Sequence, residues 1–154
     1  MAHPQTGEIA PDFTLPTDNG QVTLSSLKGK PVVVYFYPKD DTSGCTKEAI
    51  AFSQLKPEFD KLGVKVIGIS PDSVTKHEKF RSKHALTIDL VADEERTALE
   101  AYGVWVEKSM YGRKYMGVER TTFLIGADGR IVQTWNKVKV AGHAEAVLEA
   151  ARTL

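Results

Sequence analysis

The sequence predicts one α/β domain in which helices cover a central mixed sheet. Two patterns typical of buried strands, "PVVVYFYP" and "VKVIGIS", are each followed by a helical segment, which is the order of a βαβ unit. Two further strand patterns and a helical segment follow near the C-terminus. A chain of 154 residues is long enough to bury about two-thirds of its unfolded surface in one core. We therefore expect a single domain over residues 1–154.

The N-terminal part is expected to form a β-hairpin. The segment "DFTLPTDNGQVTL" alternates apolar and polar residues on both sides of Asn19-Gly20, a dipeptide that readily takes the positive φ angles of a tight turn. The next run, Val32–Tyr37, is apolar throughout and lies between two prolines. Such a run is typical of a strand covered on both faces, so Val32–Tyr37 is predicted to be a central strand.

A helix is predicted over Cys45–Leu62. Apolar residues recur there at spacings of three and four, namely Ala49, Phe52, Leu55, Phe59 and Leu62. Proline lacks the backbone N–H of a helix interior, so we expect an irregularity before Pro57. Gly63 is expected to end the helix.

The remaining segments continue the alternation of strands and helices. "VKVIGIS" is a second buried strand, and "SVTKHEKFRSKH" is a polar helix opened by Asp72 or Ser73. "RTTFLIG" and "RIVQTW" are strands separated by Ala127-Asp128-Gly129, and "HAEAVLEAARTL" is a closing helix. This order best matches a thioredoxin-like architecture.

Composition excludes several classes of partner. Twenty basic and twenty acidic residues balance, so the net charge does not attract nucleic acid or an anionic membrane. The N-terminus has neither a basic start nor an apolar core, and no apolar run approaches ~18 residues. The single cysteine excludes an internal disulfide and a multi-cysteine zinc site, and it fits a reducing compartment. We expect a soluble, cytoplasmic protein without a cofactor or metal.

Cys45, the only cysteine, is expected to be reactive. Ligand sites in open α/β sheets lie beyond the carboxyl ends of the strands, and Cys45 follows the predicted central strand through a short loop. It would lie in the first helical turn, where unpaired backbone N–H groups stabilise a thiolate. The neighbouring residues are polar, which argues against an inert buried thiol. The helix dipole alone rarely suffices, so a cation or further donors must help.

Three other classes of function are possible for a chain with one such cysteine. A thioredoxin-type disulfide reductase needs C-x-x-C, but Glu48 stands at the second cysteine position. A cysteine hydrolase needs a histidine base near Cys45, drawn from His77, His84 or His143; His77 and His84 lie on a polar helix and are expected to be solvated. A non-enzymatic redox sensor or chaperone-like module on the same fold remains an alternative.

The segment around Cys45 resembles the active site of a known family. Pro38, Thr42 and Cys45 have the spacing P-x-x-x-T-x-x-C within "YFYPKDDTSGCTKEA". This segment is similar to that of the peroxiredoxins, specifically the bacterioferritin comigratory protein or peroxiredoxin Q group. The similarity extends through "GEIAPDFTLP", "VIGISPDS" and "ERTTFLIGADGRI". It implies a thioredoxin-like fold and thiol-dependent reduction of hydrogen peroxide and organic hydroperoxides.

The resemblance also assigns roles to residues. It implies that Cys45 is the peroxidatic cysteine, that the Thr42 hydroxyl hydrogen-bonds its sulfur and the bound peroxide, and that Pro38 shields the pocket. Arg120 would supply the cation, and its guanidinium suits this role because it stays charged and holds its donors in fixed geometry. Glu48, three residues after Cys45, either orients Arg120 or interacts with the helix dipole as a first-turn acid.

The sequence departs from the family pattern at two positions. Many relatives have proline at the position of Ser43, which is variable within the motif. Many also have a second, resolving cysteine at the position of Ile50, or on the next helix around Ser82 to His84, and this chain has none. It resembles a one-cysteine member that needs an external thiol from glutathione, glutaredoxin, thioredoxin or another subunit's Cys45. A monomer or weak homodimer is expected.

Overall fold

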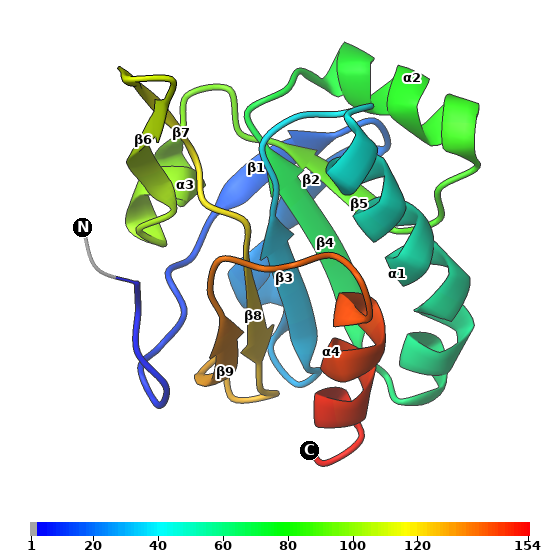
Figure 1. Cartoon of the computed structure of the whole chain (residues 1–154). Coiled ribbons are helices and arrows are strands. Elements are labelled where there is room, and N and C mark those ends of the chain that lie inside the picture. The colour runs from blue at the N-terminus through cyan, green and yellow to red at the C-terminus, as the bar shows by residue number, and fades with distance from the viewer. Residues whose placement is uncertain (1–2) are drawn as a thin grey trace.

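The computed structural model describes residues 3–154, which form a mixed sheet flanked by helices (Figure 1). The strands of this part of the chain are β1 (Thr14–Thr17), β2 (Gly20–Thr23), β3 (Val32–Phe36), β4 (Lys65–Ser70), β5 (Asp89–Ala92), β6 (Trp105–Met110), β7 (Arg113–Val118), β8 (Thr121–Ile125) and β9 (Ile131–Trp135). The α-helices are α1 (Ser43–Lys61), α2 (Val74–His84), α3 (Thr97–Ala101) and α4 (His143–Ala151), with a 3-10 turn η1 at Leu24–Leu27.

The main sheet has seven strands in the order β2-β1-β5-β4-β3-β8-β9. Strands β3, β4 and β5 are parallel, whereas β1, β8 and β9 pair in antiparallel fashion with their neighbours. Strands β6 and β7 form a separate hairpin, at the upper left in Figure 1. The thioredoxin-like α/β architecture predicted from the sequence is confirmed.

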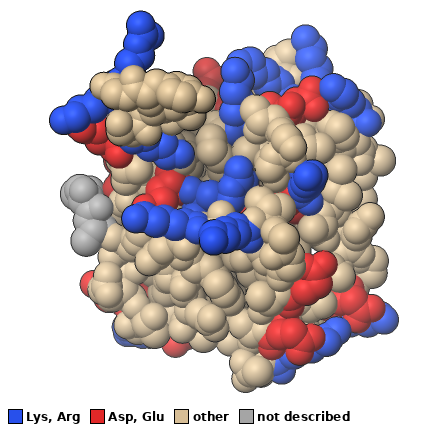
Figure 2. Space-filling model, viewed as in Figure 1, with Lys and Arg blue, Asp and Glu red and all other residues tan. Residues whose placement is uncertain are grey.

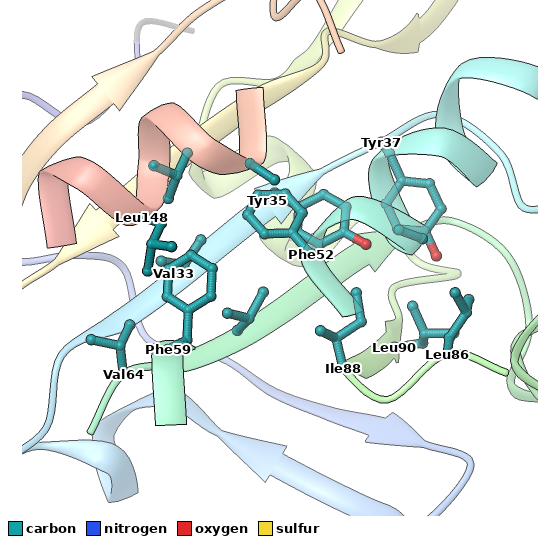
Figure 3. Close-up of a cluster of buried hydrophobic side chains, with 14 of the residues drawn as sticks. Val33, Tyr35, Tyr37, Phe52, Phe59, Val64, Leu86, Ile88, Leu90 and Leu148 are labelled. Carbon is teal, nitrogen blue, oxygen red and sulfur yellow. The ribbon is translucent and has the colours of Figure 1, made fainter. Parts of the chain in front are cut away.

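The side chains of β3 alternate between two hydrophobic cores. One core faces α1, α2 and α4, and it receives Val33 and Tyr35 of β3 and the following Tyr37 (Figure 3). The other core faces α3 and the N-terminal segments, and it receives Val32, Val34 and Phe36. Because both faces of β3 are covered, its apolar residues are continuous, as predicted; the strand ends at Phe36, one residue early.

The N-terminal hairpin is confirmed, but its turn lies one residue earlier than predicted. Thr17 pairs with Gly20, so Asp18 and Asn19 are the turn residues. The positive φ angle falls on Gly20, at +122°, and not on Asn19. Glycine takes this angle without a steric penalty at the start of β2.

Helix α1 runs without interruption through Pro57, so the irregularity expected there does not break it. Pro57 has no N–H to donate to the Ser53 carbonyl, four residues earlier. The Thr87 hydroxyl donates to that carbonyl instead, at 3.3 Å, and the Thr87 N–H donates to the Ser53 hydroxyl at 3.1 Å. Gly63 follows the end of the helix with a positive φ, as expected.

Helix α2 begins after Ser73, whose hydroxyl accepts a hydrogen bond from the Lys76 N–H at 3.2 Å. Of the two candidates for the helix start, Ser73 is therefore the cap and Asp72 is not. Among residues 3–154, no helix combines the length and apolarity needed to cross a lipid bilayer.

Candidate active site

Strand pairing brings Cys45 and Arg120 together from positions 75 residues apart. The last residue of β3, Phe36, pairs with Thr121, the first residue of β8. The loop that follows β3 therefore lies beside the segment that precedes β8. Cys45 is the third residue of α1, which begins after that loop, so its place in the first helical turn is confirmed.

Arg120 bridges the thiol and a buried carboxylate. Its Nη2 donates to Cys45 Sγ at 3.2 Å, and its Nη1 donates to Glu48 Oε1 at 2.6 Å. The Arg120 side chain is 17% exposed and that of Glu48 is 1% exposed. Glu48 thus holds the Arg120 cation beside the sulfur, where the sequence predicts that a cation is needed.

The ionisation of this pair is governed by burial. Burial raises the pKa of Glu48 to about 7, although the Arg120 charge and hydrogen bond act to lower it. Burial lowers the pKa of Arg120, but Glu48 and Cys45 outweigh it, so the net pKa of Arg120 is raised. Of the two roles considered for Glu48, orienting Arg120 fits the geometry, because an acid that only met the helix dipole would be exposed.

The helix N-terminus adds donors to the site. No described residue accepts from the backbone N–H groups of Gly44 and Cys45. A Cβ at Gly44 would lie 3.3 Å from Arg120 Nη2, so glycine lets the guanidinium approach the helix closely. Cys45 itself is 1% exposed. The sulfur thus has one hydrogen-bond donor among the described residues, Arg120 Nη2, and lies at the positive end of α1, in a buried position that also belongs to the hydrophobic core.

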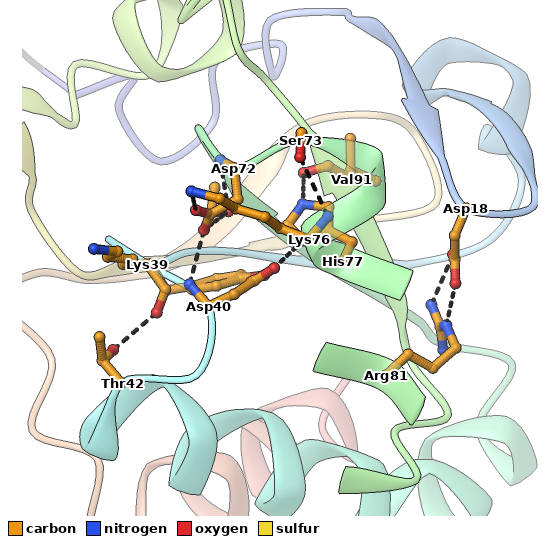
Figure 4. Close-up of polar contacts among 12 residues, drawn as sticks. Asp18, Lys39, Asp40, Thr42, Asp72, Ser73, Lys76, His77, Arg81 and Val91 are labelled. Carbon is orange, nitrogen blue, oxygen red and sulfur yellow. Dashed lines mark hydrogen bonds and ion pairs between the residues drawn. The ribbon is translucent and has the colours of Figure 1, made fainter. Parts of the chain in front are cut away.

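Thr42 and Pro38 lie in the loop before α1. Thr42 is the N-terminal cap residue of α1, and its hydroxyl donates to the Lys39 carbonyl at 2.8 Å (Figure 4). In this structure the hydroxyl proton therefore points to Lys39 and not to the Cys45 sulfur. The contact of Thr42 with a bound peroxide stays a prediction, as does the shielding role of the half-buried Pro38.

A buried polar network anchors the same loop, and it corrects the expectation that His77 is solvated. His77 is 0% exposed. Its Nδ1 hydrogen-bonds Asp40 at 2.6 Å and its Nε2 donates to the Val91 carbonyl at 3.1 Å (Figure 4). Asp40 also accepts from the Tyr37 hydroxyl at 2.6 Å, and its N–H donates to Asp72 at 2.7 Å.

None of the described histidines hydrogen-bonds Cys45. His84 pairs with Asp41, and its side chain is only 20% exposed, so it too is less solvated than expected. His143 Nε2 lies 2.8 Å from the Thr122 hydroxyl, and burial lowers the pKa of His143 to about 4. The base of a cysteine hydrolase is therefore not in place. Residues 3–154 also contain no cluster of three or more His, Cys, Asp or Glu side chains arranged to hold a metal.

Comparison with known proteins establishes the family. The AhpC/TSA family model matches residues 6–134. Peroxiredoxin Bcp of Bacillus subtilis is 48% identical over 151 residues, which covers 97% of this chain and 94% of the relative. Peroxiredoxin Bcp of Xanthomonas campestris is 49% identical over 140 residues, with coverages of 90% and 88%. The chain belongs to the AhpC/TSA family.

Comparison with solved structures identifies the group within the family to which this chain belongs. Xanthomonas campestris peroxiredoxin Q superposes with a TM-score of 0.90 at 45% identity, over 99% of this chain and 97% of the other. Peroxidoxin BcpB of Mycobacterium tuberculosis gives 0.86 at 35% identity, over 99% of both chains. Within its family the chain is thus a peroxiredoxin of the Bcp or peroxiredoxin Q group, and it is a thiol-dependent peroxidase.

The Xanthomonas protein differs from this chain in its cysteines. Its solved structures include variants in which two different cysteines are each replaced by serine. This chain has Cys45 alone. The chemistry that follows oxidation of the thiol must therefore differ between the two proteins wherever a second cysteine takes part.

Proposed function

We propose that Cys45 is the peroxidatic cysteine and that a thiol from outside the chain regenerates it. The observation that carries this proposal is the 3.2 Å contact between Arg120 Nη2 and Cys45 Sγ. Arg120 favours the thiolate before the reaction, and it is placed to stabilise negative charge on the departing oxygen. The N–H groups of Gly44 and Cys45, for which no acceptor is found among the described residues, would add positive partial charge at the start of the helix.

The first reaction step needs only the Cys45 thiolate and the hydroperoxide. The Cys45 thiolate attacks one oxygen of the hydroperoxide R–O–O–H, the O–O bond breaks, and the other oxygen leaves as an alkoxide that takes up a proton. The products are the Cys45 sulfenic acid and the alcohol R–OH, or water when the substrate is hydrogen peroxide. The sulfur is oxidised and the peroxide is reduced.

Organic hydroperoxides are included in the proposed substrate range. A structural study of the Xanthomonas campestris bacterioferritin comigratory protein concerns its alkyl peroxide reduction activity. That protein is 44% identical to this chain, over 99% of this chain and 98% of the other.

The reductant, location and assembly form the finer part of the proposal. With one cysteine, the sulfenic acid needs glutathione, glutaredoxin, thioredoxin or the Cys45 of a second subunit. A free thiol in a reactive position fits the reducing cytoplasm. A monomer or weak homodimer is proposed, which analytical ultracentrifugation of the reduced and oxidised protein tests.

Peroxide consumption by the pure protein tests the function and the reductant together. The assay is run with dithiothreitol, with glutathione plus glutaredoxin, and with thioredoxin plus its reductase. We expect turnover with at least one system, and Cys45→Ser should abolish it while circular dichroism shows an intact fold. Turnover by the Cys45→Ser variant would overturn the assignment. Oxidation of the wild-type protein without turnover in every system would favour a redox sensor instead.

A further inference from the structure

A pocket of about 360 Å³ opens beside the catalytic arginine. Three cationic side chains line it: Lys108 of β6, Arg120 before β8, and Lys137 after β9. Figure 2 shows Lys and Arg side chains gathered across the middle of this face, below the β6–β7 hairpin. Arg120 also contacts the Cys45 sulfur, so this one side chain connects the pocket to the buried thiol, which does not itself line the pocket.

The walls of the pocket are held in place by the fold. A Cβ at Gly117 would lie 3.3 Å from Lys108 Cδ, so the Lys108 stem crosses the neighbouring strand β7 at a residue without a side chain. The opposite wall is fixed by the Val138 N–H, which donates to the Arg120 carbonyl at 2.9 Å. Lys108 and Lys137 are thus carried on two separate segments that line the same pocket as Arg120.

The two lysines are available to bind an anion. No carboxylate within residues 3–154 forms an ion pair with Lys108 or Lys137, whereas both acids of the pocket are engaged elsewhere. Glu107 lies 3.7 Å from Lys114, and Glu119 lies 3.0 Å from His3. Burial, followed by the nearby Arg120 charge, lowers the pKa of Lys108, although the charges of Glu119 and Cys45 act to raise it. An anion between these cations would relieve their repulsion.

We propose that Lys108 and Lys137 form a subsite for the carboxylate of a small thiol that regenerates Cys45. The inference rests on the proposed function, because a chain with one cysteine must accept an external thiol at this position. Three cationic and two acidic side chains line the pocket, and this excess of positive charge favours a small thiol that carries a carboxylate. A neutral or cationic thiol would leave the two ammonium groups without a partner.

The bound thiol would regenerate Cys45 in two steps. The sulfur of the bound thiol R–SH attacks the sulfur of Cys45–SOH, the S–O bond breaks, and the hydroxyl group leaves as water with the thiol proton. The product is the mixed disulfide Cys45–S–S–R. A second R–SH then attacks the R sulfur, which releases R–S–S–R and restores the Cys45 thiol.

The test compares thiols of similar size and different charge on the pre-formed sulfenic acid. The probes are 3-mercaptopropionate, 2-mercaptoethanol and cysteamine, and each rate is divided by the thiolate concentration of the probe. We expect the carboxylate thiol to react at least ~10-fold faster than the neutral one, with cysteamine slowest, and we expect added salt to reduce the difference.

Substitution of both lysines tests whether the preference for a carboxylate thiol arises in this pocket. Lys108→Gln with Lys137→Gln should bring the three normalised rates within about threefold of one another. The matched control, Lys56→Gln with Lys61→Gln, removes the same charge from the far half of α1 and should keep the preference. Rate ratios within each variant are compared, so that a general change in the reactivity of Cys45 does not affect the result.

The experiments distinguish failure of the subsite from failure of the proposed function. A wild-type protein that does not consume peroxide contradicts the proposed function itself. A wild-type protein that consumes peroxide, yet reacts with the three thiols at equal normalised rates, overturns only the subsite. The subsite is also overturned if the variant with Lys108→Gln and Lys137→Gln still reacts faster with the carboxylate thiol. If the pocket variant instead discriminates less between carboxylated and neutral hydroperoxides, with thiol rates unchanged, the subsite serves the peroxide and the thiol assignment is wrong.

Discussion

In the proposed mechanism the reactivity of Cys45 depends most on Arg120, because its two terminal nitrogens serve two different partners. One donates to the sulfur and the other to Glu48. A lysine in its place has a single nitrogen on a flexible stem and could not hold both contacts in fixed directions. The planar guanidinium therefore supplies the charge, while Glu48 sets its orientation.

Removing the guanidinium should slow the attack on peroxide. We expect Arg120→Met to reduce the rate of sulfenic acid formation at least ~100-fold, since a donor to the transition state is lost. Arg120→Lys should recover part of this loss. Stopped-flow kinetics with hydrogen peroxide measure both variants. A change smaller than about threefold for Arg120→Met would show that Arg120 is only a nearby charge.

Glu48 gives the fold a distinctive dependence on pH. Its pKa is 4.5 in the reference state and about 7 in the fold, where burial opposes the charged form. Between these values the folded protein keeps a proton that the unfolded chain has lost, so the stability from Glu48 is complete below about pH 4.5 and is lost as the pH rises through about 7.

Glu48→Gln should therefore flatten the stability profile. The wild-type free energy of unfolding should fall between about pH 5 and about pH 8 by more than that of the variant. Urea denaturation at the two pH values measures this difference, and Glu149→Gln, an exposed change on α4, is the control. Equal slopes for wild type and Glu48→Gln would mean that Glu48 does not titrate in this range.

At the scale of secondary-structure elements, the first turn of α1 buries the Cys45 sulfur, so this turn has to move before the sulfur can react with a thiol. Cys45 is 1% exposed, so an incoming thiol requires local movement around it. Residues five apart in an α-helix have Cα atoms about 8–9 Å from each other, beyond the ~7 Å reach of a disulfide. A cysteine at position 50 could therefore bond to Cys45 only if the turn unwinds.

Ile50→Cys tests this movement. We expect the oxidised wild-type protein to accumulate a sulfenic acid or a mixed disulfide, and we expect the variant to form an internal disulfide through transient opening of the turn. Intact mass spectrometry separates the gain of an oxygen or a thiol from the loss of two hydrogens. If no internal bridge forms while amide exchange in this turn is fast, the helical placement of positions 45 and 50 is wrong.

The loop before α1 is held from the side of α2. Asp40 pairs with the buried His77, whereas the neighbouring Asp41 pairs with Lys83 and His84 at the surface. Removing one partner of a buried pair costs much more than removing one partner of an exposed pair. The buried contact should therefore hold the loop, and the exposed contacts should contribute little.

His77→Asn should lower the free energy of unfolding by about 3–5 kcal/mol, because Asp40 is then left buried without this partner. His84→Asn, its surface counterpart on the same helix, should leave stability almost unchanged. Urea denaturation of both variants measures the contrast. Similar losses for the two variants would show that the buried network does not anchor the loop.

For the whole molecule, local pattern predicted the elements that have a strong signal of their own. The N-terminal hairpin, β3, α1, β4, α2 and the C-terminal ββα segment followed from periodicity and from turn residues. Strand β5 and helix α3, of four and five residues, were not predicted, since they are too short to show a period. Strand β5 exists because it pairs with β4 and β1.

The family motif predicted the site residues better than hydrophobic periodicity and turn residues did. Arg120 reaches Cys45 as the resemblance implied, because strand pairing joins two distant segments. The contact of Glu48 with Arg120 was one of two alternatives inferred from the position of Glu48 in the helix. The burial of His77 was missed, since it depends on Asp40, which lies 37 residues away. One signal was available: Phe80 follows His77 by three residues, so the two share one face of an otherwise polar helix.

Single-turnover oxidation tests the central claim most directly. The reduced protein is mixed with about one equivalent of hydrogen peroxide without any thiol, trapped with a sulfenic acid reagent, and digested for mass spectrometry. We predict that one peroxide is consumed per chain and that the trapped oxygen lies on Cys45. Met110 and Met116, which are 56% and 49% exposed, are the internal control for unassisted oxidation. Peroxide left unconsumed, or oxygen on these methionines while Cys45 stays unmodified, would contradict the account.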